Sequence, residues 1–134
     1  MAGYANLSNT DESILSEKDS IVIMNNLESI KGGKTLDITG FGPTIIKAGH
    51  VIIRETATGL FKPMPLATND TVYGSLPSGH TYAGILVATI RTAKPFAGIM
   101  IRGTVNTVAS PFSLTSILSA VKTALPQLIF TADE

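Results

Sequence analysis

Three short runs rich in β-branched residues, each opened or closed by glycine, constrain the fold of this chain more than any other feature. The runs cover residues 46–55, 82–91 and 97–106. Valine, isoleucine and threonine fit the pleated surface of a sheet, and an adjacent glycine marks a turn, a bulge or a close backbone approach. We therefore expect a compact, mainly β domain, of the α+β class because a single helix follows these runs.

Two strands and a turn are expected before the first run. Residues 20–24 are predicted to form a strand that stops at Asn25 and Asn26, and residues 35–39 alternate apolar and polar side chains as a half-buried strand does. The paired glycines between these segments supply the positive φ angles of a tight turn. The sequence therefore predicts that the two strands pair as a hairpin.

The later strands and loops follow from the same signals. Further strands are expected at residues 44–47 and 50–56, and the proline-rich residues 63–81 are predicted to form the longest loop. Within the last run, Gly103 is expected to mark a bulge or a close backbone approach. Alternate residues of that strand should face opposite sides of the sheet, with Ile99, Ile101 and Val105 on one side and Met100, Arg102 and Thr104 on the other.

One amphipathic helix is predicted over residues 113–125, with Ser113 as its N-cap. Pro126 ends the helix, because proline lacks the N–H that a helix interior needs. Residues 127–131 are then expected to form a short last strand. The apolar positions of the helix recur at helical spacing and form a stripe that must pack on the sheet: Leu114, Ile117, Leu118, Val121 and Leu125.

The length of 134 residues suits one folded domain, residues 21–134, preceded by an extended N-terminal arm, residues 1–20. Only 15% of the residues are charged, below the usual share of about a quarter, so a partner is expected to cover part of the surface. The sequence has no cysteine, which excludes disulfides and thiolate chemistry. We recognise neither a signal peptide nor a membrane span, so synthesis in a cytoplasm is expected.

The charges balance overall but are unevenly distributed. The net charge is zero, which argues against a nucleic-acid partner held by excess cations. Residues 1–20 hold four carboxylates and one lysine, a net charge of −3, whereas residues 31–102 hold eight cations and three carboxylates, a net charge of +5. This distribution is either ordinary surface dispersion or an attraction between the acidic arm and the basic body of a neighbouring copy. An arm this polar either folds back on its own domain or lies on a partner.

Signals for catalysis or cofactor binding are weak. Gly33-Lys34-Thr35 resembles the end of a P-loop, but Glu28 stands where that loop needs a glycine. Ser78 lacks the flanking glycines of a nucleophile elbow. His50 and His80 have no partner at metal-ligand spacing and are predicted to be surface residues beside turns. We therefore expect no catalytic residue, no metal site and no cofactor, in a protein that is not an enzyme.

Six phrases follow one another between Thr44 and the C-terminus: Ile46-Lys-Ala-Gly-His-Val-Ile, Ala57-Thr-Gly-Leu-Phe-Lys-Pro, Ala83-Gly-Ile-Leu, Ile101-Arg-Gly-Thr-Val-Asn, Val121-Lys-Thr-Ala-Leu and Gln127-Leu-Ile-Phe. Their order and spacing, over about two-thirds of the chain, resemble the head decoration (capsid-cementing) proteins of tailed bacteriophages. The chain departs from that pattern in the proline-rich loop at 63–81, where His80 precedes the next strand, and in the hairpin predicted within residues 20–43.

The resemblance implies a structural virion protein that binds the major capsid protein on the outer surface of the capsid and stabilises the shell. Proteins of this family are compact β domains, often homo-oligomers such as trimers, and their N-terminal arm commonly adds a strand to the capsid lattice. Such a protein is made in the cytoplasm of the host bacterium and acts on the virion exterior. Neither nucleic acid nor a membrane is an expected partner.

Two sets of contact residues are predicted. The apolar anchors of the capsid contact are expected within the arm, at Tyr4, Leu7, Ile14 and Leu15. Contacts between copies are expected within the loop at 63–81, at Pro63, Pro65, Tyr73 and Pro77.

Two other classes of function remain open. One is a different virion component, of the tail, baseplate or fibre-attachment type. The other is a module that binds a host-surface glycan or a head fibre. The glycan alternative has a thin aromatic platform, because the chain has no tryptophan and only eight tyrosines and phenylalanines together.

Overall fold

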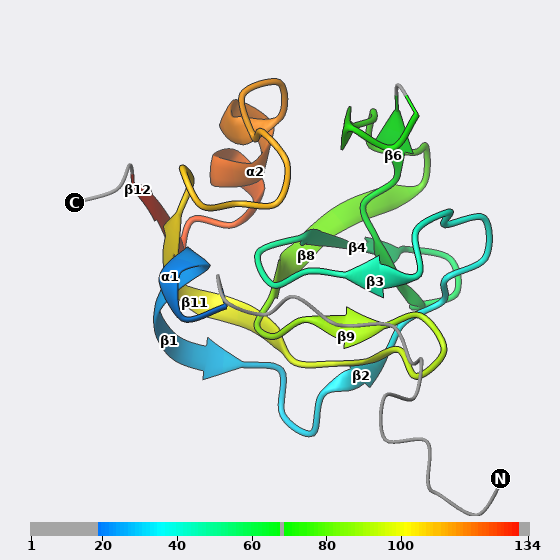
Figure 1. Ribbon diagram of the computed structural model, residues 1–134, viewed down its shortest axis with the longest axis horizontal. Helices are drawn as coiled ribbons and strands as arrows, with labels where there is room; N and C mark the ends of the chain where they lie inside the picture. Colours follow the sequence, from blue (N-terminus) through cyan, green and yellow to red (C-terminus); the bar gives the residue numbers. More distant parts are fainter. Residues whose placement is uncertain (1–18, 68, 132–134) are drawn as a thin grey trace, which may run out of the picture.

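The computed structural model describes residues 19–67 and 69–131, which form a mainly β domain (Figure 1). Strands make up 43% of the structure and helices 8%, so the predicted fold class is confirmed. A four-residue helix, α1 (Asp19–Val22), precedes the first strand, and a two-turn helix, α2 (Leu118–Ala124), lies near the C-terminus. α2 packs against strands β8 and β12, whose bounds follow.

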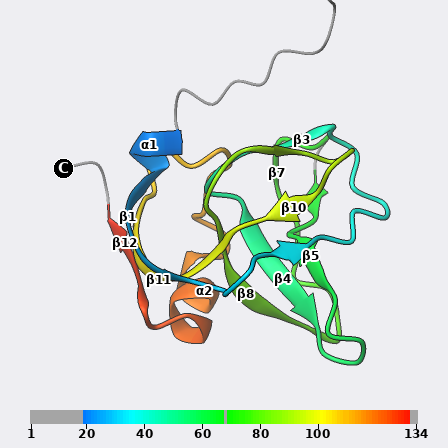
Figure 2. The ribbon, with the colours of Figure 1, turned by 90° about the horizontal axis from the view of Figure 1, so that it is seen from below.

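One six-stranded sheet forms the centre of the domain. Its strands are β1 (Ile23–Ser29), β11 (Ile99–Asn106), β8 (His80–Leu86), β4 (Val51–Glu55) and β5 (Phe61–Pro63) in that spatial order, with β12 (Leu128–Thr131) also paired to β11. The pairings are antiparallel except that of β11 with β12, which is parallel. β4 and β8 lie side by side in the middle of the sheet (Figure 2).

Three short ribbons of two strands each complete the fold. They are β2 (Lys34–Thr35) with β10 (Phe96–Ala97), β3 (Ile45–Ile46) with β9 (Ile90–Arg91), and β6 (Leu66–Ala67) with β7 (Val72–Tyr73). The third ribbon falls within the region predicted to be the longest loop. The run at residues 82–91, expected to be one strand, is divided between two elements. β8 ends at Leu86, and β9 pairs with β3 outside the main sheet.

The central strands are buried on both faces, which explains their nearly continuous apolar sequences. Successive side chains of a strand point to opposite faces. Val51 and Ile53 of β4 enter one hydrophobic cluster, whereas Ile52 enters a second one. The first cluster is closed by residues of α2 and of the segment before it, and the second by residues of the β2–β10 and β3–β9 ribbons. The sheet thus separates two layers of core.

The predicted hairpin near the N-terminus is wrong. Residues 19–22 are helical, and β1 begins at Ile23 and runs through Asn25 and Asn26 to Ser29. Its partner is β11, while the residues after the glycine turn pair with β10. Asparagine disfavours strands only weakly, and at a solvent-exposed sheet edge the hydrogen bonds to β11 override that preference.

Gly103 meets the expectation of a close backbone approach. Its φ angle is +152°, and a Cβ atom there would collide with the carbonyl oxygen of Asn25 on β1. The register of β1 on β11 shifts three times, starting between Ile23 and Asn25. These irregularities break the strict alternation of faces. Met100 and Val105 therefore share one cluster while Ile99 lies in the other, so the predicted grouping of Ile99 with Val105 is wrong.

The C-terminal helix is shorter than predicted. α2 begins at Leu118, its N-cap position is Ile117, and no side chain caps it. Ser113 is therefore not the N-cap: its hydroxyl accepts a hydrogen bond from the Thr115 N–H (3.3 Å). Serine and threonine side chains in this stretch bond to nearby backbone and so compete with helix formation. The predicted apolar stripe still packs on the core, because Leu114, Ile117 and Val121 are buried.

Candidate functional surfaces

The base of the N-terminal arm is fixed in the core. Val22, the last residue of α1, is fully buried, and a Cβ atom on Gly49 would lie 2.6 Å from its Cγ2 atom. The predicted capsid contacts Tyr4, Leu7, Ile14 and Leu15 lie outside the described residues. The chain therefore enters the described domain at a buried residue, Val22.

The first strand forms an exposed edge next to that anchor. β1 pairs with β11 on one side, and no other described strand pairs with its second side. Ile21, Met24 and Leu27 are 49%, 43% and 59% exposed, so apolar side chains follow one another along α1 and β1. The register shifts of β1 twist this edge, a feature that disfavours indiscriminate strand pairing.

The four residues predicted to form contacts between copies differ in their exposure to solvent. Tyr73 is 4% exposed, and its hydroxyl accepts a hydrogen bond from the Val51 N–H (3.1 Å), so it belongs to the core of its own chain. Pro63 is buried as well. Only Pro65 and Pro77 are partly exposed, and together with Pro63 they line a groove with a volume of about 290 Å³. Burial makes Tyr73 unsuited to the predicted role, whereas a contact at Pro65 and Pro77 stays a prediction.

Polar side chains surround this groove. The Lys62 ammonium lies 2.9 Å from Glu55 Oε1 and 3.3 Å from His80 Nε2, and His80 Nδ1 lies 2.9 Å from the Ser78 carbonyl. Lysine only donates, so Nε2 of His80 accepts and its Nδ1 carries the proton that bonds to Ser78. The hydrogen bond from Lys62 lowers the pKa of Glu55.

Two further carboxylates lie in the groove, at Asp37 and Asp70. Asp37 Oδ1 accepts hydrogen bonds from the Thr39 hydroxyl (2.7 Å) and the Thr39 N–H (3.1 Å). These bonds hold the pKa of Asp37 below its usual value, with a smaller contribution from the positive charge of Lys62. Among the described residues, no group of three or more histidine, aspartate or glutamate side chains is arranged to hold a metal ion.

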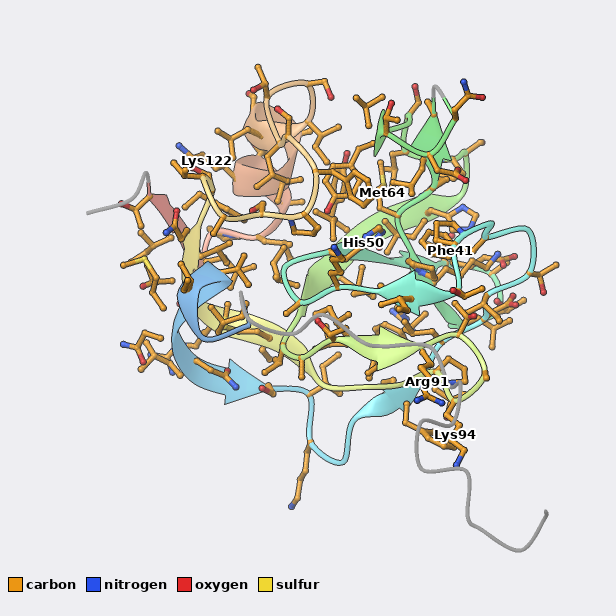
Figure 3. All side chains as sticks on the ribbon, in the orientation of Figure 1. Phe41, His50, Met64, Arg91, Lys94 and Lys122 are labelled. Carbon is orange, nitrogen blue, oxygen red and sulfur yellow. The ribbon has the colours of Figure 1, made fainter. Side chains whose placement is uncertain are left out.

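His50 is buried, and its predicted surface position is wrong. It is 1% exposed and makes edge-on contacts with Phe41, Tyr73 and Phe112, with ring centroids 5.5, 5.2 and 5.7 Å away. Its Nε2 donates to the Met64 carbonyl (3.0 Å), and its Nδ1 has no hydrogen-bond partner in the described part of the chain. Burial lowers the pKa of His50 to about 4, so the imidazole is neutral at pH 7. Figure 3 shows His50 beside Met64.

Four cations gather along two of the short ribbons. We call Lys34, Lys47, Arg91 and Lys94 the basic patch: Lys34 lies on β2, Lys47 directly after β3, Arg91 on β9 and Lys94 in the turn before β10. Arg91 and Lys94 lie close together in Figure 3. Beside them, the side chain of Phe96 is 67% exposed, and the Lys34 ammonium lies 5.7 Å from the ring centroid of Phe61. The sequence showed only an excess of cations over residues 31–102; the structure places these four on or beside the β2–β10 and β3–β9 ribbons.

The described residues form a small β domain with a core on both faces of its sheet and with Val22 buried just before the first strand. Comparison with protein-family models, with curated proteins and with solved structures found no match. None of the described helices is long and apolar enough to cross a membrane.

Proposed function

We propose that this protein is a structural virion protein that binds the outer surface of a phage capsid and stabilises the shell. In this proposal the N-terminal arm supplies the contact with the major capsid protein, the domain sits on the capsid exterior, and the protein performs no catalysis. The sequence resemblance to head decoration proteins is the source of the proposal. The structure adds the arrangement of surfaces on which it depends.

The observation that carries the proposal is the buried residue Val22 beside an exposed apolar edge. Large apolar side chains that remain exposed in a row mark surfaces for a partner. Here Ile21, Met24 and Leu27 lie where the arm leaves the domain, and Val22 between them is buried in the core. A strand added to the capsid lattice by the arm would thus be held to a rigid domain. That coupling is what a cementing protein needs.

Oligomerisation would strengthen such an attachment. Several arms joined through a trimer convert weak single contacts into high avidity, because each later contact forms within one assembly. Among the residues predicted to join the copies, the partly exposed pair Pro65 and Pro77 is available at the groove. Analytical ultracentrifugation of a Pro65→Ser/Pro77→Ser variant tests this role: we expect a smaller assembly than for the unchanged protein, and an unchanged assembly contradicts it.

The experiment that tests the proposal is cryo-electron microscopy of expanded, protein-stripped capsids incubated with the purified protein. We expect extra density repeated over the faces of the shell. Density confined to a single vertex or to the tail would replace the proposal by the tail, baseplate or fibre-attachment alternative. Absence of any added density would contradict both.

The groove favours a second candidate, a glycan-binding module. Phe41 lines this groove together with Asp37, Asp70 and His80. An aromatic ring beside hydrogen-bonding side chains is an arrangement that recognises sugars, because one sugar face is apolar and its rim is polar. A glycan array probed with the full-length protein tests it. Binding that is lost in Asp70→Asn would support this function, and no binding to any glycan would exclude it for the array tested.

A further inference from the structure

Three cations of the basic patch, Lys34, Lys47 and Lys94, have no ion-pair partner in the described part of the chain. Ion pairs are formed by Lys62 with Glu55 and by Arg102 with Glu28, and neither includes one of these three lysines. The hydrogen bonds that fix Asp37 come from Thr39, and Lys62 is the cation that acts on its pKa. Lys34, Lys47 and Lys94 are exposed and form no ion pair with any described residue.

The complementary charge lies in one stretch of the N-terminal arm. Residues 1–10 contain no charged side chain, whereas residues 11–17, which we call the acidic segment, contain Asp11, Glu12 and Glu17 and no cation. Between these carboxylates stand Ile14 and Leu15. The segment therefore combines negative charge with two apolar side chains, and the patch combines positive charge with the exposed ring of Phe96. The segment and the patch are thus complementary in charge, and each also offers apolar side chains.

The length of the chain allows this match within one molecule. Val22 at the base of the arm contacts Gly49, and four residues before Gly49 the strand residue Ile45 pairs with Arg91. The Lys94 N–H donates to the Arg91 carbonyl (3.0 Å), so Lys94 lies in the adjoining turn. Four residues of chain span at most about 14 Å, whereas the eight residues from Asp11 to Asp19 span up to about 28 Å. The acidic segment is therefore long enough to reach the patch.

We propose that the acidic segment docks on the basic patch of its own chain and holds the N-terminal arm against the domain in the free protein. The arm is then released when it binds the capsid lattice more tightly than it binds the patch. This release rests on the proposed capsid function, whereas the docking itself is a property of the isolated protein. The same segment would bind either the capsid or the domain at any one time. Docking on the patch would thus compete with nonspecific contacts of the arm before the capsid is bound.

The attachment is held by the tether and by several contacts acting together. A single ion pair at an exposed site is weak and is screened by salt. A segment joined to its site by a short linker, however, meets that site at an effective concentration on the order of millimolar. Docking should therefore persist at low ionic strength and weaken as salt is added, while remaining independent of protein concentration.

Zero-length carbodiimide cross-linking tests this proposal, because it joins a carboxylate to an amine only when the two touch. The sample is full-length protein, an equal mixture of ¹⁵N-labelled and unlabelled chains, analysed by mass spectrometry. We expect links from Asp11, Glu12 or Glu17 to Lys34, Lys47 or Lys94, in peptides that carry one isotope only. The yield should fall as sodium chloride is raised.

Charge reversal supplies the matched controls. The variant Arg91→Glu/Lys94→Glu should lower the yield of links to Lys34 and Lys47 at least about threefold, because neighbouring cations no longer attract the segment. Lys122→Glu, at an exposed lysine on α2, should leave that yield unchanged. Combining Asp11→Lys and Glu12→Lys with Arg91→Glu/Lys94→Glu should create new links between position 94 and position 11 or 12. Circular dichroism of each variant checks that the domain remains folded.

Three results would overturn the proposal. Links in peptides of mixed isotope would assign the docked segment to a second copy. Links to Lys122 as frequent as links to the patch would show an arm without a preferred site, and no links at all would show that the segment does not touch the patch. None of these outcomes depends on capsids, so a failure here is distinguishable from a failure of the proposed function.

Discussion

The buried imidazole of His50 makes the stability of the domain depend on pH. Its Nε2 hydrogen bond to Met64 is satisfied, but protonation of Nδ1 would place a positive charge among three aromatic rings with no acceptor for the new proton in the described part of the chain. Tyr73, which packs against the imidazole, has a raised pKa because it is buried and therefore stays uncharged. The fold consequently favours neutral His50.

We predict a loss of stability between about pH 6.5 and pH 4. The pKa of His50 is lowered from 6.5 to about 4 in the fold, so the unfolded chain takes up the proton first as the pH falls. Full stability is present above the unfolded value, and about 2–3 kcal/mol is lost on going from pH 7.5 to pH 4.5. Urea unfolding at both pH values measures this loss. His50→Phe should lose clearly less over the same interval, and an equal loss in that variant would assign the effect to other groups.

Two glycines with positive φ angles should respond differently to a methyl group. Gly103→Ala places a Cβ atom against the Asn25 carbonyl and 2.6 Å from the Met100 sulfur, so we expect a destabilisation of about 3 kcal/mol. Gly32→Ala is the matched control: its φ is +79° and no atom lies within 4 Å of the added carbon. Only the backbone preference is lost there, about 1 kcal/mol. Urea unfolding of both variants measures the difference, and equal losses would contradict the close packing of β1 on β11.

At the scale of elements, β11 organises the sheet because three strands pair with it. β1 lies on one side, while β8 and β12 share the other side at successive positions along the strand. The parallel pairing places Leu128 of β12 opposite Gly103 and directs its side chain into the first cluster. The short final strand thus closes the core beneath α2.

We predict that two adjacent residues of β12 differ sharply in their contribution to stability. Leu128→Ala removes a side chain that is 4% exposed and should cost about 3 kcal/mol of unfolding free energy. Ile129→Ala removes a side chain that is 61% exposed and should change the stability by less than about 0.5 kcal/mol. Thermal or urea unfolding gives both values. A large loss at Ile129 with none at Leu128 would mean that β12 presents its opposite face to the core.

The strands that could be predicted from the sequence are those with strong local patterns. The β-branched runs of β4, β8 and β11 indicated strands, and Gly103 indicated the irregularity in β11. The partner of β1 could not be predicted, because pairing with β11 joins residues far apart in the sequence and leaves no local mark. The start of α2 was missed because Ser113 resembles an N-cap but instead forms a local turn.

The candidate surfaces were less predictable than the strands, because they combine residues that are far apart in the sequence. The rings around His50 come from three separate segments, and the glycine beside it suggested a turn. The residues of the basic patch come from separate places in the sequence and lie on or beside two ribbons whose pairing leaves no local mark. The apolar run from Val51 to Ile53 directly after His50 was the available signal that this histidine enters the core.

The whole molecule combines a two-layer core with an exposed apolar edge near the point where the N-terminal residues enter the domain. The core on both faces of the sheet fixes the domain, and Val22 fixes the base of the arm within it. The exposed apolar edge lies beside that base, and the basic patch lies within reach of the acidic segment. The central claim is that the arm, and not the domain alone, attaches this protein to the capsid shell.

Co-sedimentation with expanded, protein-stripped capsids distinguishes attachment by the arm from attachment by the domain, using full-length protein beside a form that lacks residues 1–18. This truncation stops before α1, because removal of Val22 would open the core, and circular dichroism verifies that the shortened protein is folded. We predict saturable binding by the full-length protein and at least about a hundredfold weaker binding by the truncated form, since a strand of main-chain hydrogen bonds is lost from each copy. Undiminished binding of the folded, truncated protein would contradict the account.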